Sequence, residues 1–521
     1  MTMTIKKSSV KEYLARPLDS FTWMKTLPRE VLLKELNTFK VRPVFKTEPW
    51  DHQLVCHLLG MTFPNFLFLL DMGMGKTAID LNLFVQMVRE GKVKKGIVTV
   101  PRLINLGSWE EGVAKHSDLS VTLVEGSIAD KYEQLLHPQT DLTVIDYAGF
   151  QSALSKANTS KKSKKATTFD EAKIRAVAKN YQFFTSDETH KAKNKDSTRY
   201  SILNKFTQRI QTRYGMTGTL FGRDPLDVFS QFYLIDRGET FGPHIGLFRE
   251  AFFEAKFNGF GNDYVFKKSM SRTFFRFTHH RSIRYSEWEN PNIPEKEMVP
   301  IKVKLAEEQR EYYYQALQGL IQSKGKTRQL DASYLRMRQI LAGFIQWKED
   351  GEKLGVTFPD NPKLQALERI LAGMHGTKMV VSHEFIPSGQ LVADRLTSLG
   401  IKFEWLYGKS KNKKDAVKRF LADPDIEVFL MNSESGGTGT DGLQEQASIL
   451  VFYECPESPI TRQQVIKRIV RPGQKRKCKI YDLVAERTID LKILRFNEEG
   501  KSLHDAIIDG EFSPDLLKNS D

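Results

Sequence analysis

This chain of 521 residues lacks the features that define several other protein classes. It has only three cysteines, which are too few and too scattered for a disulfide framework or a four-ligand zinc site: Cys56, Cys455 and Cys478. No apolar run approaches the ~18 residues of a membrane span, and the N-terminal segment has no signal-peptide core. No tandem repeat is apparent. We therefore expect a soluble protein without membrane association, cytoplasmic, or nuclear in a eukaryote.

The chain does have an excess of positive charge and enough apolar residues to form cores. Its 78 lysines and arginines exceed its 64 aspartates and glutamates, and hydrophobic residues make up 40% of the chain. The formal net charge of +14 favours polyanionic partners without identifying one. Domains of ~100–200 residues are the norm, so at least two folded units are expected.

Two series of short apolar runs alternate with amphipathic stretches, which is typical of parallel α/β sheets. The first series occupies residues 66–70, 96–100, 121–124, 142–145, 181–185 and 214–216. The second occupies residues 379–381, 403–406, 428–431, 449–452 and 480–483. Between the two series, residues 237–365 show a mostly helical pattern with aromatic and basic clusters. The fold class predicted is therefore α/β, with two lobes and helical insertions between them.

These patterns predict five segments. They are an N-terminal extension (1–45), a first lobe with a helical protrusion after about 237 (46–285), a helical insertion and hinge (286–365), a second lobe (366–490), and a C-terminal brace helix and tail (491–521). The brace helix is expected to pack against the first lobe. Within the helical protrusion after about 237, Phe274, Phe275 and Phe277 are interpreted as packing residues rather than as a stacking surface for bases. His279 and His280 have no acidic or cysteine ligand at a suitable spacing for a metal site.

The segment LLDMGMGKTAI follows an apolar run and opens a helical pattern, which is the setting of a phosphate-binding loop. Glycines allow the backbone to approach phosphates closely, Lys76 can reach the terminal phosphates, and the Thr77 hydroxyl can bind Mg²⁺. Leucine replaces the first glycine of the standard template. The predicted ATP-binding residues of the loop are Gly73, Met74, Gly75, Lys76 and Thr77.

The acidic pair Asp187 and Glu188 comes directly after the apolar run YQFFTS. Ligands of parallel α/β sheets bind at the carboxyl ends of the strands, where this pair is expected to lie. Asp187 is predicted to hold Mg²⁺ with Thr77, and Glu188 to polarise the attacking water of phosphoryl transfer. Alone, such a pair is more often a helix N-terminus with favourable charge than a catalytic site. In combination with the phosphate loop, it favours catalysis.

Together these motifs resemble the superfamily 2 nucleic-acid motors, and among them the Snf2-like family, over most of residues 47–490. DETHKAKN is similar to the family's DEAH box, TEPWDHQ to its adenine-contacting segment, and MTGTLFGRDPLDVF to its motif III. The resemblance implies two RecA-like lobes that bind ATP and Mg²⁺ in a cleft between them. It also implies that Gln53 hydrogen-bonds adenine.

In the second lobe, QVIKRIVRPGQ (464–474) follows the family's QxxxRxxRxGQ pattern, with Val470 in place of the usual histidine. The resemblance implies that Gln464 contacts ATP. Arg468 and Arg471 are three residues apart, so on a helix they would share one face. From that face they are predicted to stabilise the charge of the transition state, a contribution on the order of 10³–10⁵ in rate.

Contacts with nucleic acid are expected to be made to phosphates and to be independent of base sequence. The segments VPRLINLGSWEEGV, VIDYAGF, KMVVSHEF and SESGGTGTDGLQEQA resemble the family's tracking-strand motifs. Residues 151–170 form a predicted surface loop whose lysines either contact DNA or are simply solvated. The candidate contacts are Arg102, Tyr147, Lys161, Lys162, Thr217, Ser382, Gly437 and Thr438.

The function implied is a DNA-dependent ATPase that translocates on duplex DNA and remodels DNA or protein–DNA complexes. It is expected to act as a monomer, with a protein partner that directs it. The alternatives are a strand-separating DNA or RNA helicase and a catalytically silent nucleic-acid-binding scaffold. An unrelated P-loop enzyme is disfavoured because it would not need the QVIKRIVRPGQ segment.

Overall fold

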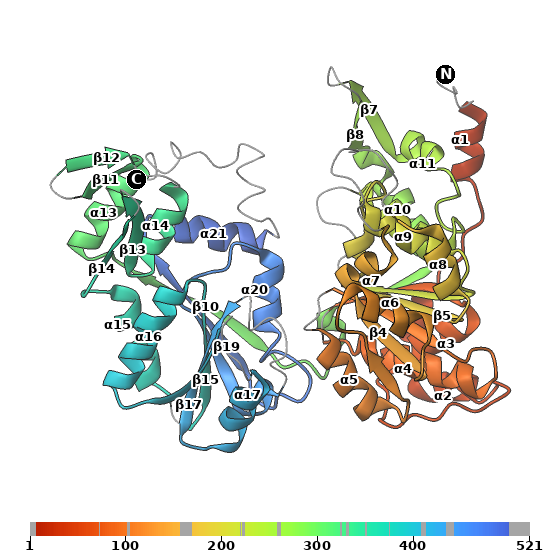
Figure 1. Cartoon of the computed structure of the whole chain (residues 1–521), viewed down its shortest axis with the longest axis horizontal. Coiled ribbons are helices and arrows are strands. Elements are labelled where there is room, and N and C mark those ends of the chain that lie inside the picture. Colours follow the sequence, from red (N-terminus) through yellow and green to blue (C-terminus); the bar gives the residue numbers. More distant parts are fainter. Residues whose placement is uncertain are drawn as a thin grey trace. The chain divides into compact units, whose positions relative to one another are not determined.

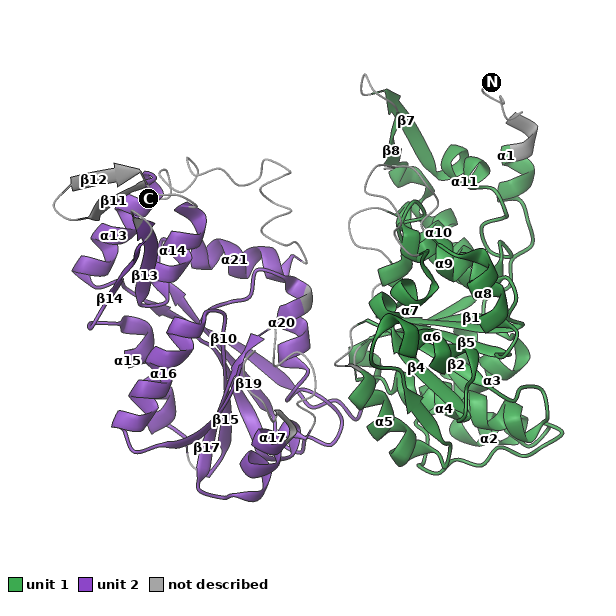
Figure 2. Cartoon of the chain, viewed as in Figure 1, with its two compact units in different colours: residues 1–290 green, residues 291–521 purple. Residues whose placement is uncertain are grey.

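The structure is a computed structural model that describes residues 7–71, 73–101, 105–156, 169–218, 220, 225–257, 262–323, 326–329, 333–349, 352–374, 376–407, 413–433 and 442–499. The chain divides into two compact units, Met1–Asn290 and Pro291–Asp521 (Figure 2). Each unit has its own parallel sheet. Among the described residues, no helix is both long and apolar enough to cross a membrane.

The sheet of unit 1 has seven strands in the order β3-β4-β2-β5-β6-β1-β9, and all of its neighbouring pairs are parallel. Figure 1 labels two of these strands, β4 and β5. The strands are β1 (Asn65–Leu70), β2 (Gly96–Val100), β3 (Val121–Leu123), β4 (Leu142–Asp146), β5 (Phe183–Asp187), β6 (Thr212–Thr217) and β9 (Ser282–Tyr285). The six apolar runs predicted for the first lobe overlap β1 to β6. Strand β9 was not predicted, because the exposed Arg284 interrupts its short apolar pattern.

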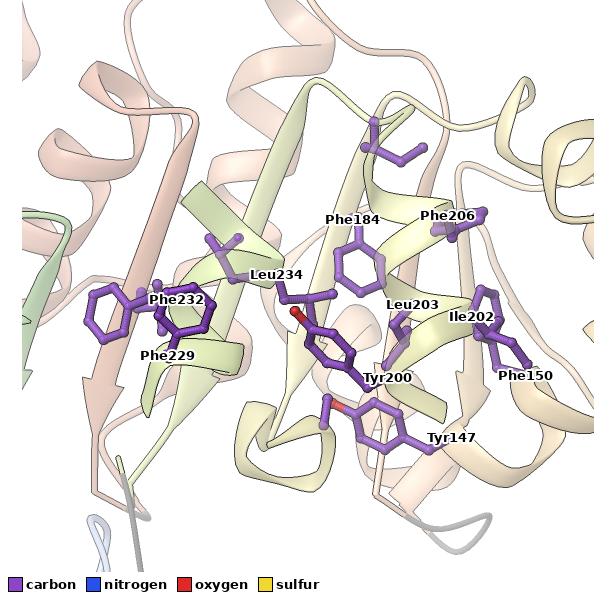
Figure 3. Packing of buried hydrophobic residues seen from close by; sticks show 14 of the residues in the cluster. Tyr147, Phe150, Phe184, Tyr200, Ile202, Leu203, Phe206, Phe229, Phe232 and Leu234 are labelled. Carbon is purple, nitrogen blue, oxygen red and sulfur yellow. The ribbon is translucent and has the colours of Figure 1, made fainter. Parts of the chain in front are cut away.

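Helices cover the sheet of unit 1 and bury its strands. They are α3 (Asp51–Thr62), α4 (Lys76–Arg89), α5 (Asn105–His116), α6 (Ile128–Leu136), α7 (Tyr147–Leu154), α8 (Glu171–Ala178), α9 (Thr198–Thr207) and α10 (Asp227–Asp236). Figure 3 shows Phe184 of β5 beside Phe206 of α9, with ring centroids 5.9 Å apart. Strands covered in this way are continuously apolar, which explains why the runs were recognisable in the sequence.

The N-terminal extension is part of unit 1. It contains α1 (Lys7–Leu14), η1 (Thr22–Thr26) and α2 (Arg29–Leu36). The hydroxyl of Tyr13 donates to the carbonyl of Phe241 at 3.1 Å, and the Tyr13 ring stacks on Phe277. The predicted protrusion contains α11 (Ile245–Phe252), η3 (Lys268–Met270), α12 (Ser271–Thr278) and a hairpin of β7 (Phe253–Phe257) and β8 (Asn262–Phe266).

The aromatic cluster of α12 is confirmed in part as a packing feature. Phe274 and Phe277 are buried against the rings of Phe241 and Phe252. Phe275 remains 44% exposed. The protrusion is thus held by an aromatic core that it shares with α1.

The sheet of unit 2 has six strands in the order β10-β19-β18-β15-β17-β16, again all parallel. They are β10 (Lys296–Val303), β15 (Lys378–His383), β16 (Lys402–Leu406), β17 (Ile426–Asn432), β18 (Ala447–Phe452) and β19 (Cys478–Ala485). The five runs predicted for the second lobe overlap β15 to β19. Helices α15 (Pro362–Ala372), α16 (Ile386–Ser398), α17 (Lys413–Ala422), α19 (Leu443–Gln446) and α20 (Pro459–Ile466) belong to this unit.

The prediction of a helical insertion and hinge over 286–365 is wrong in two respects. Strand β10 pairs with β19 along its whole length, so the segment begins by completing the second sheet. It then contains α13 (Glu307–Leu317) and α14 (Ser333–Leu341) together with two hairpins. The hairpins are β11 (Leu320–Ser323) with β12 (Lys326–Gln329), and β13 (Phe344–Glu349) with β14 (Glu352–Thr357). The charged residues and the proline of β10, KEMVPIKV, concealed a half-exposed edge strand.

The predicted brace helix is α21 (Ile489–Glu498), and its packing on the first lobe stays a prediction. Its side chains Ile489, Ile493 and Leu494 lie in the core of unit 2. The backbone N–H of Ile489 donates a hydrogen bond to the hydroxyl oxygen of Tyr313 at 3.0 Å. Helix α21 is therefore an internal element of the second unit.

Candidate functional site

A phosphate-loop geometry lies between β1 and α4. Gly73 and Gly75 have φ values of 83° and 72°, a region that side chains rarely enter. A Cβ at Gly75 would lie 2.1 Å from Nε2 of Gln53, so only glycine fits there. Lys76 is the first residue of α4, and the amides of the first turn of a helix are available to an anion. The strand, loop and helix predicted from LLDMGMGKTAI are confirmed.

The start of α3 holds this loop in place. Trp50 N–H donates to Oε1 of Gln53 at 2.8 Å, and Gln53 Nε2 donates to the carbonyl of Gly75 at 3.4 Å. His52 Nε2 lies 2.8 Å from the carbonyl of Met74, so it carries the proton of that hydrogen bond. Burial lowers the pKa of His52, which favours a neutral ring. The segment TEPWDHQ thus contacts the phosphate loop directly.

The acidic pair approaches Lys76 from the end of β5. Lys76 Nζ lies 3.5 Å from Glu188 Oε1 and donates to the carbonyl of Leu70 at 3.1 Å. Glu188 has φ 53° and ψ 58°, a conformation that turns the chain sharply after Asp187. Parallel strands β1 and β5 end at one edge of the sheet, which brings together groups 112 residues apart in sequence.

The two carboxyl groups have opposite electrostatic environments. Burial and the negative charge of Glu188 raise the pKa of Asp187 to about 6, although Lys76 and the Trp109 Nε1 donor at 3.2 Å partly oppose this. Burial also opposes ionisation of Glu188, but Lys76 and His190 outweigh it and lower the pKa of Glu188 to about 2. Glu188 is thus held as a carboxylate beside an amine.

Sequence reasoning missed two supports of this pair. His190 Nδ1 lies 3.2 Å from Oε2 of Glu188 and 3.0 Å from Oγ1 of Thr217. The Thr217 hydroxyl lies 3.2 Å from the same carboxylate oxygen. The second support is the indole of Trp109, whose position in α5 gave no signal of a contact with Asp187. Each support comes from a separate element, so only the fold brings them together.

Three residues predicted to contact nucleic acid have buried side chains, and these contacts stay a prediction. Tyr147 donates to the carbonyl of Asp187 at 2.8 Å and is 1% exposed. Thr217 is fully buried beside Glu188, and Ser382 is fully buried with its hydroxyl 2.7 Å from that of Ser433. These residues position the strand ends. The remaining candidates lie outside the described residues: Arg102, Lys161, Lys162, Gly437 and Thr438.

The arginines of unit 2 follow α20 rather than lying on it. The helix ends at Ile466, and residues 467–469 form a turn, so the predicted shared helical face of Arg468 and Arg471 is wrong. Gln464 does lie on α20 and is partly exposed. Arg468 is 9% exposed, whereas Arg471 is more accessible. Pro472 and Gly473, which disfavour helix, follow immediately.

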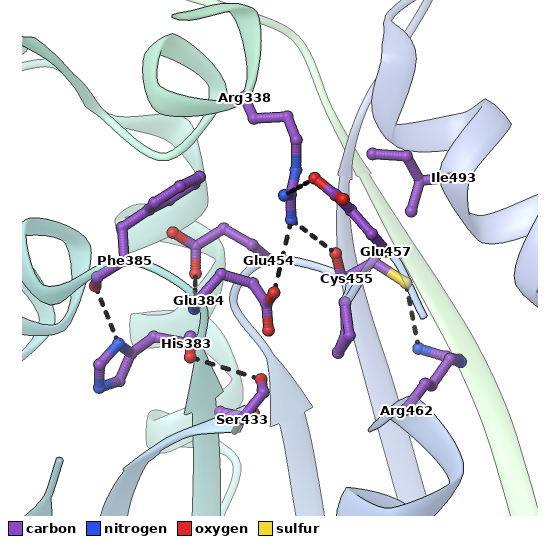
Figure 4. A network of polar contacts seen from close by, with 12 residues as sticks. Arg338, His383, Glu384, Phe385, Ser433, Glu454, Cys455, Glu457, Arg462 and Ile493 are labelled. Atoms are coloured by element: carbon purple, nitrogen blue, oxygen red, sulfur yellow. Dashed lines mark hydrogen bonds and ion pairs between the residues drawn. The ribbon is translucent and has the colours of Figure 1, made fainter. Parts of the chain in front are cut away.

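A polar network that sequence reasoning missed anchors α20. Arg462 forms a buried two-bond ion pair with Asp482 of β19. Figure 4 shows Arg338 of α14 directed at Glu457, at Glu384 and at the carbonyl of Cys455. Cys455 and Glu457 come just before α20 in sequence, and Glu384 follows β15. The Arg338 guanidinium lies 3.7 Å from the Glu384 carboxylate and 3.2 Å from the carbonyl oxygen of Cys455. The insertion is thus joined to the strand ends of the second sheet.

A parallel sheet with a glycine loop after one strand and an acidic pair after another defines a RecA-like nucleotide-binding unit, and unit 2 supplies a second parallel α/β sheet. The chain belongs to the SNF2-related family. The SNF2-related domain matches residues 21–354, and the helicase conserved C-terminal domain matches residues 362–473.

Curated relatives share part of this sequence. The chain is 31% identical over 183 residues to Helicase swr-1 of Neurospora crassa and 29% identical over 164 residues to Chromatin-remodeling ATPase INO80 of Mus musculus. These matches cover 33% and 30% of the chain but only 10% of each relative. Among solved structures, a Sulfolobus solfataricus SWI2/SNF2 ATPase core in complex with dsDNA is 18% identical with a TM-score of 0.37, covering 92% of this chain and 98% of that one.

Proposed function

We propose that the protein is a DNA-dependent ATPase that translocates on duplex DNA and remodels DNA or protein–DNA complexes. The observation that carries this proposal is the approach of Lys76 and Glu188 at the phosphate loop, 3.5 Å apart. Membership of the SNF2-related family and the net charge of +14 support DNA as the polyanionic partner on which the protein moves. We also propose that the protein acts as a monomer and that a protein partner directs it.

The residues at the phosphate loop are suited to bind a nucleoside triphosphate together with Mg²⁺. The amides of residues 73–77 and the Lys76 amine offer positive charge to phosphates, and Gln53 is assigned to the adenine edge. Thr77 and Asp187 would hold Mg²⁺, because a carboxyl group with a raised pKa gains from a nearby cation. The bound cation would supply charge neutralisation. Glu188, held ionised by its neighbours, accepts a hydrogen bond from the attacking water and orients it.

The proposal assigns Arg468 and Arg471 to stabilisation of the transition-state charge, and Gln464 to the bound ATP. The network of Arg338 and Arg462 supports this assignment, because it fixes the helix that leads into the arginine turn. Positioned guanidinium groups of this kind contribute on the order of 10³–10⁵ in rate. Phosphate contacts of both units with DNA are proposed to be independent of sequence.

The test is an ATPase titration with duplex DNA, single-stranded DNA and no DNA. Duplex DNA is expected to raise turnover several-fold, and Lys76→Ala to abolish it, since the loop loses its only side-chain ammonium. Lys402→Ala is the control, because Lys402 makes an exposed ion pair with Asp425. Equal turnover with and without every nucleic acid would contradict the proposal. DNA binding without any hydrolysis of ATP would favour the alternative, a catalytically silent nucleic-acid-binding scaffold.

A further inference from the structure

The chain leaves unit 1 directly beside the phosphate loop. Strands β1 and β9 are parallel neighbours, with Leu70 opposite Tyr285, and both end at the same edge of the sheet. The phosphate loop follows β1, and residues 286–290, here called the connecting segment, follow β9 and lead into unit 2 at Pro291. The two segments are therefore adjacent by topology, although they are more than 200 residues apart in sequence.

Asp71 joins these two segments through two hydrogen bonds. Its backbone N–H donates to the carbonyl of Tyr285 at 3.2 Å. Its carboxylate Oδ2 accepts the backbone N–H of Glu287 at 3.0 Å. On its other side, a Cβ at Gly218 would lie 3.3 Å from Cα of Asp71, so the turn after β6 packs closely on it. Asp71 is thus enclosed by three strand ends.

Further contacts fasten the connecting segment to the loop and to its surroundings. Asn290 Nδ2 donates to Sδ of Met74 at 3.6 Å, and both side chains are buried. Glu289 accepts from Ser286 N–H at 2.7 Å and pairs with Lys25 at 2.8 Å. The last residue of unit 1 therefore touches a residue of the phosphate loop, and the segment has little freedom to move independently of that loop.

We propose that Asp71 is a positioning residue that couples the phosphate loop to the connecting segment, so that nucleotide bound by the loop changes the conformation or stability of residues 286–290. This inference rests on the proposed nucleotide site. It adds the role of Asp71 and the path by which that site acts on the connecting segment. A loop that adjusts to phosphates moves the backbone next to Asp71, and its carboxylate transmits the shift to the Glu287 amide. Asp71 does not itself contact the phosphates.

The test compares Asp71→Ala and Asp71→Asn with the wild-type protein in amide hydrogen exchange of residues 286–290, with and without a non-hydrolysable ATP analogue and Mg²⁺. Wild type is expected to change its exchange in this segment when the analogue binds. Asp71→Ala is expected to bind the analogue with an affinity within about threefold of wild type, to lose the exchange response, and to turn over ATP with DNA about tenfold more slowly. Asp71→Asn retains an acceptor oxygen and should largely restore both.

The matched control is Asp141→Ala, because Asp141 also accepts a backbone N–H, that of Ser120 at 2.9 Å, far from the loop in sequence. It should leave the exchange response and turnover unchanged. The inference is overturned if Asp71→Ala keeps the exchange response, or if it loses nucleotide binding as Lys76→Ala would. Failure of the wild-type protein to bind any nucleotide would overturn the proposed function as well, which separates the two outcomes.

Discussion

Asp80 places a carboxyl group in the interior of unit 1, on the helix that follows the phosphate loop. Its Oδ1 accepts a hydrogen bond from the Thr185 hydroxyl at 2.6 Å, which does not offset the cost of burial. Burial raises the pKa of Asp80 to about 8, so the group is protonated at neutral pH. A single residue therefore makes the stability of this unit depend on pH.

Replacing Asp80 by asparagine should reveal this dependence. A carboxyl group with a raised folded-state pKa destabilises the fold progressively as the pH rises from the unfolded value of 3.8 towards 8, because only the unfolded chain ionises freely. Asn cannot ionise, so Asp80→Asn should unfold at about the same temperature as wild type at about pH 3.5, below the unfolded pKa, and at least about 3 °C higher at pH 8. Thermal unfolding at both pH values measures the difference. A constant difference at the two pH values would contradict the assignment.

At the scale of elements, α20 is fixed to the second sheet by a buried ion pair. Arg462 and Asp482 have side-chain exposures of 4% and 2%, and the guanidinium lies 4.6 Å from the centre of the Phe452 ring. Because α20 leads into the turn with Arg468 and Arg471, this pair sets the position from which the turn starts. The anchoring is a property of the helix and strand together.

Arg462→Ala should lower the free energy of unfolding by about 3–5 kcal/mol, since it leaves the Asp482 carboxylate buried without its partner. Urea unfolding followed by circular dichroism measures the loss. Arg419→Ala is the control, because Arg419 makes a similar two-bond contact with Glu404 at the surface and should shift the urea midpoint very little. Equal shifts for the two variants would show that the Arg462 pair does not anchor α20.

Strands and helices differ in how well the sequence predicted them. Apolar runs marked β1 to β6 and β15 to β19, because strands covered on both faces must be apolar throughout. Strand β10 was missed because it is an edge strand with one exposed face, and its sequence, KEMVPIKV, has charged residues and a proline in place of a continuous apolar run. Helix α20 was expected to extend to Arg468 and Arg471, whose spacing suits a helix, but it ends at Ile466 and a turn follows.

At the scale of the whole molecule, the net charge of +14 makes a prediction for the proposed DNA binding. Phosphate contacts release counterions, so affinity should fall steeply with salt. The DNA concentration that gives half-maximal ATPase stimulation is expected to rise at least about tenfold between 50 and 200 mM salt. Fluorescence anisotropy of a labelled duplex provides an independent measurement. An affinity that does not change with salt would show that binding does not depend on phosphates.

The sequence by itself determined the α/β class, the two series of strands, the phosphate loop and the acidic pair. Each of these features depends on residues that are neighbours in the sequence and have a fixed local geometry. Only the tertiary structure decided which of those residues meet. It placed Tyr147 and Thr217 against the strand ends instead of at the surface, and it set Asp71 against residues 286–290. The physical reason is that parallel strands end at a common edge, and the order of strands in a sheet is set by long-range packing that no local pattern records.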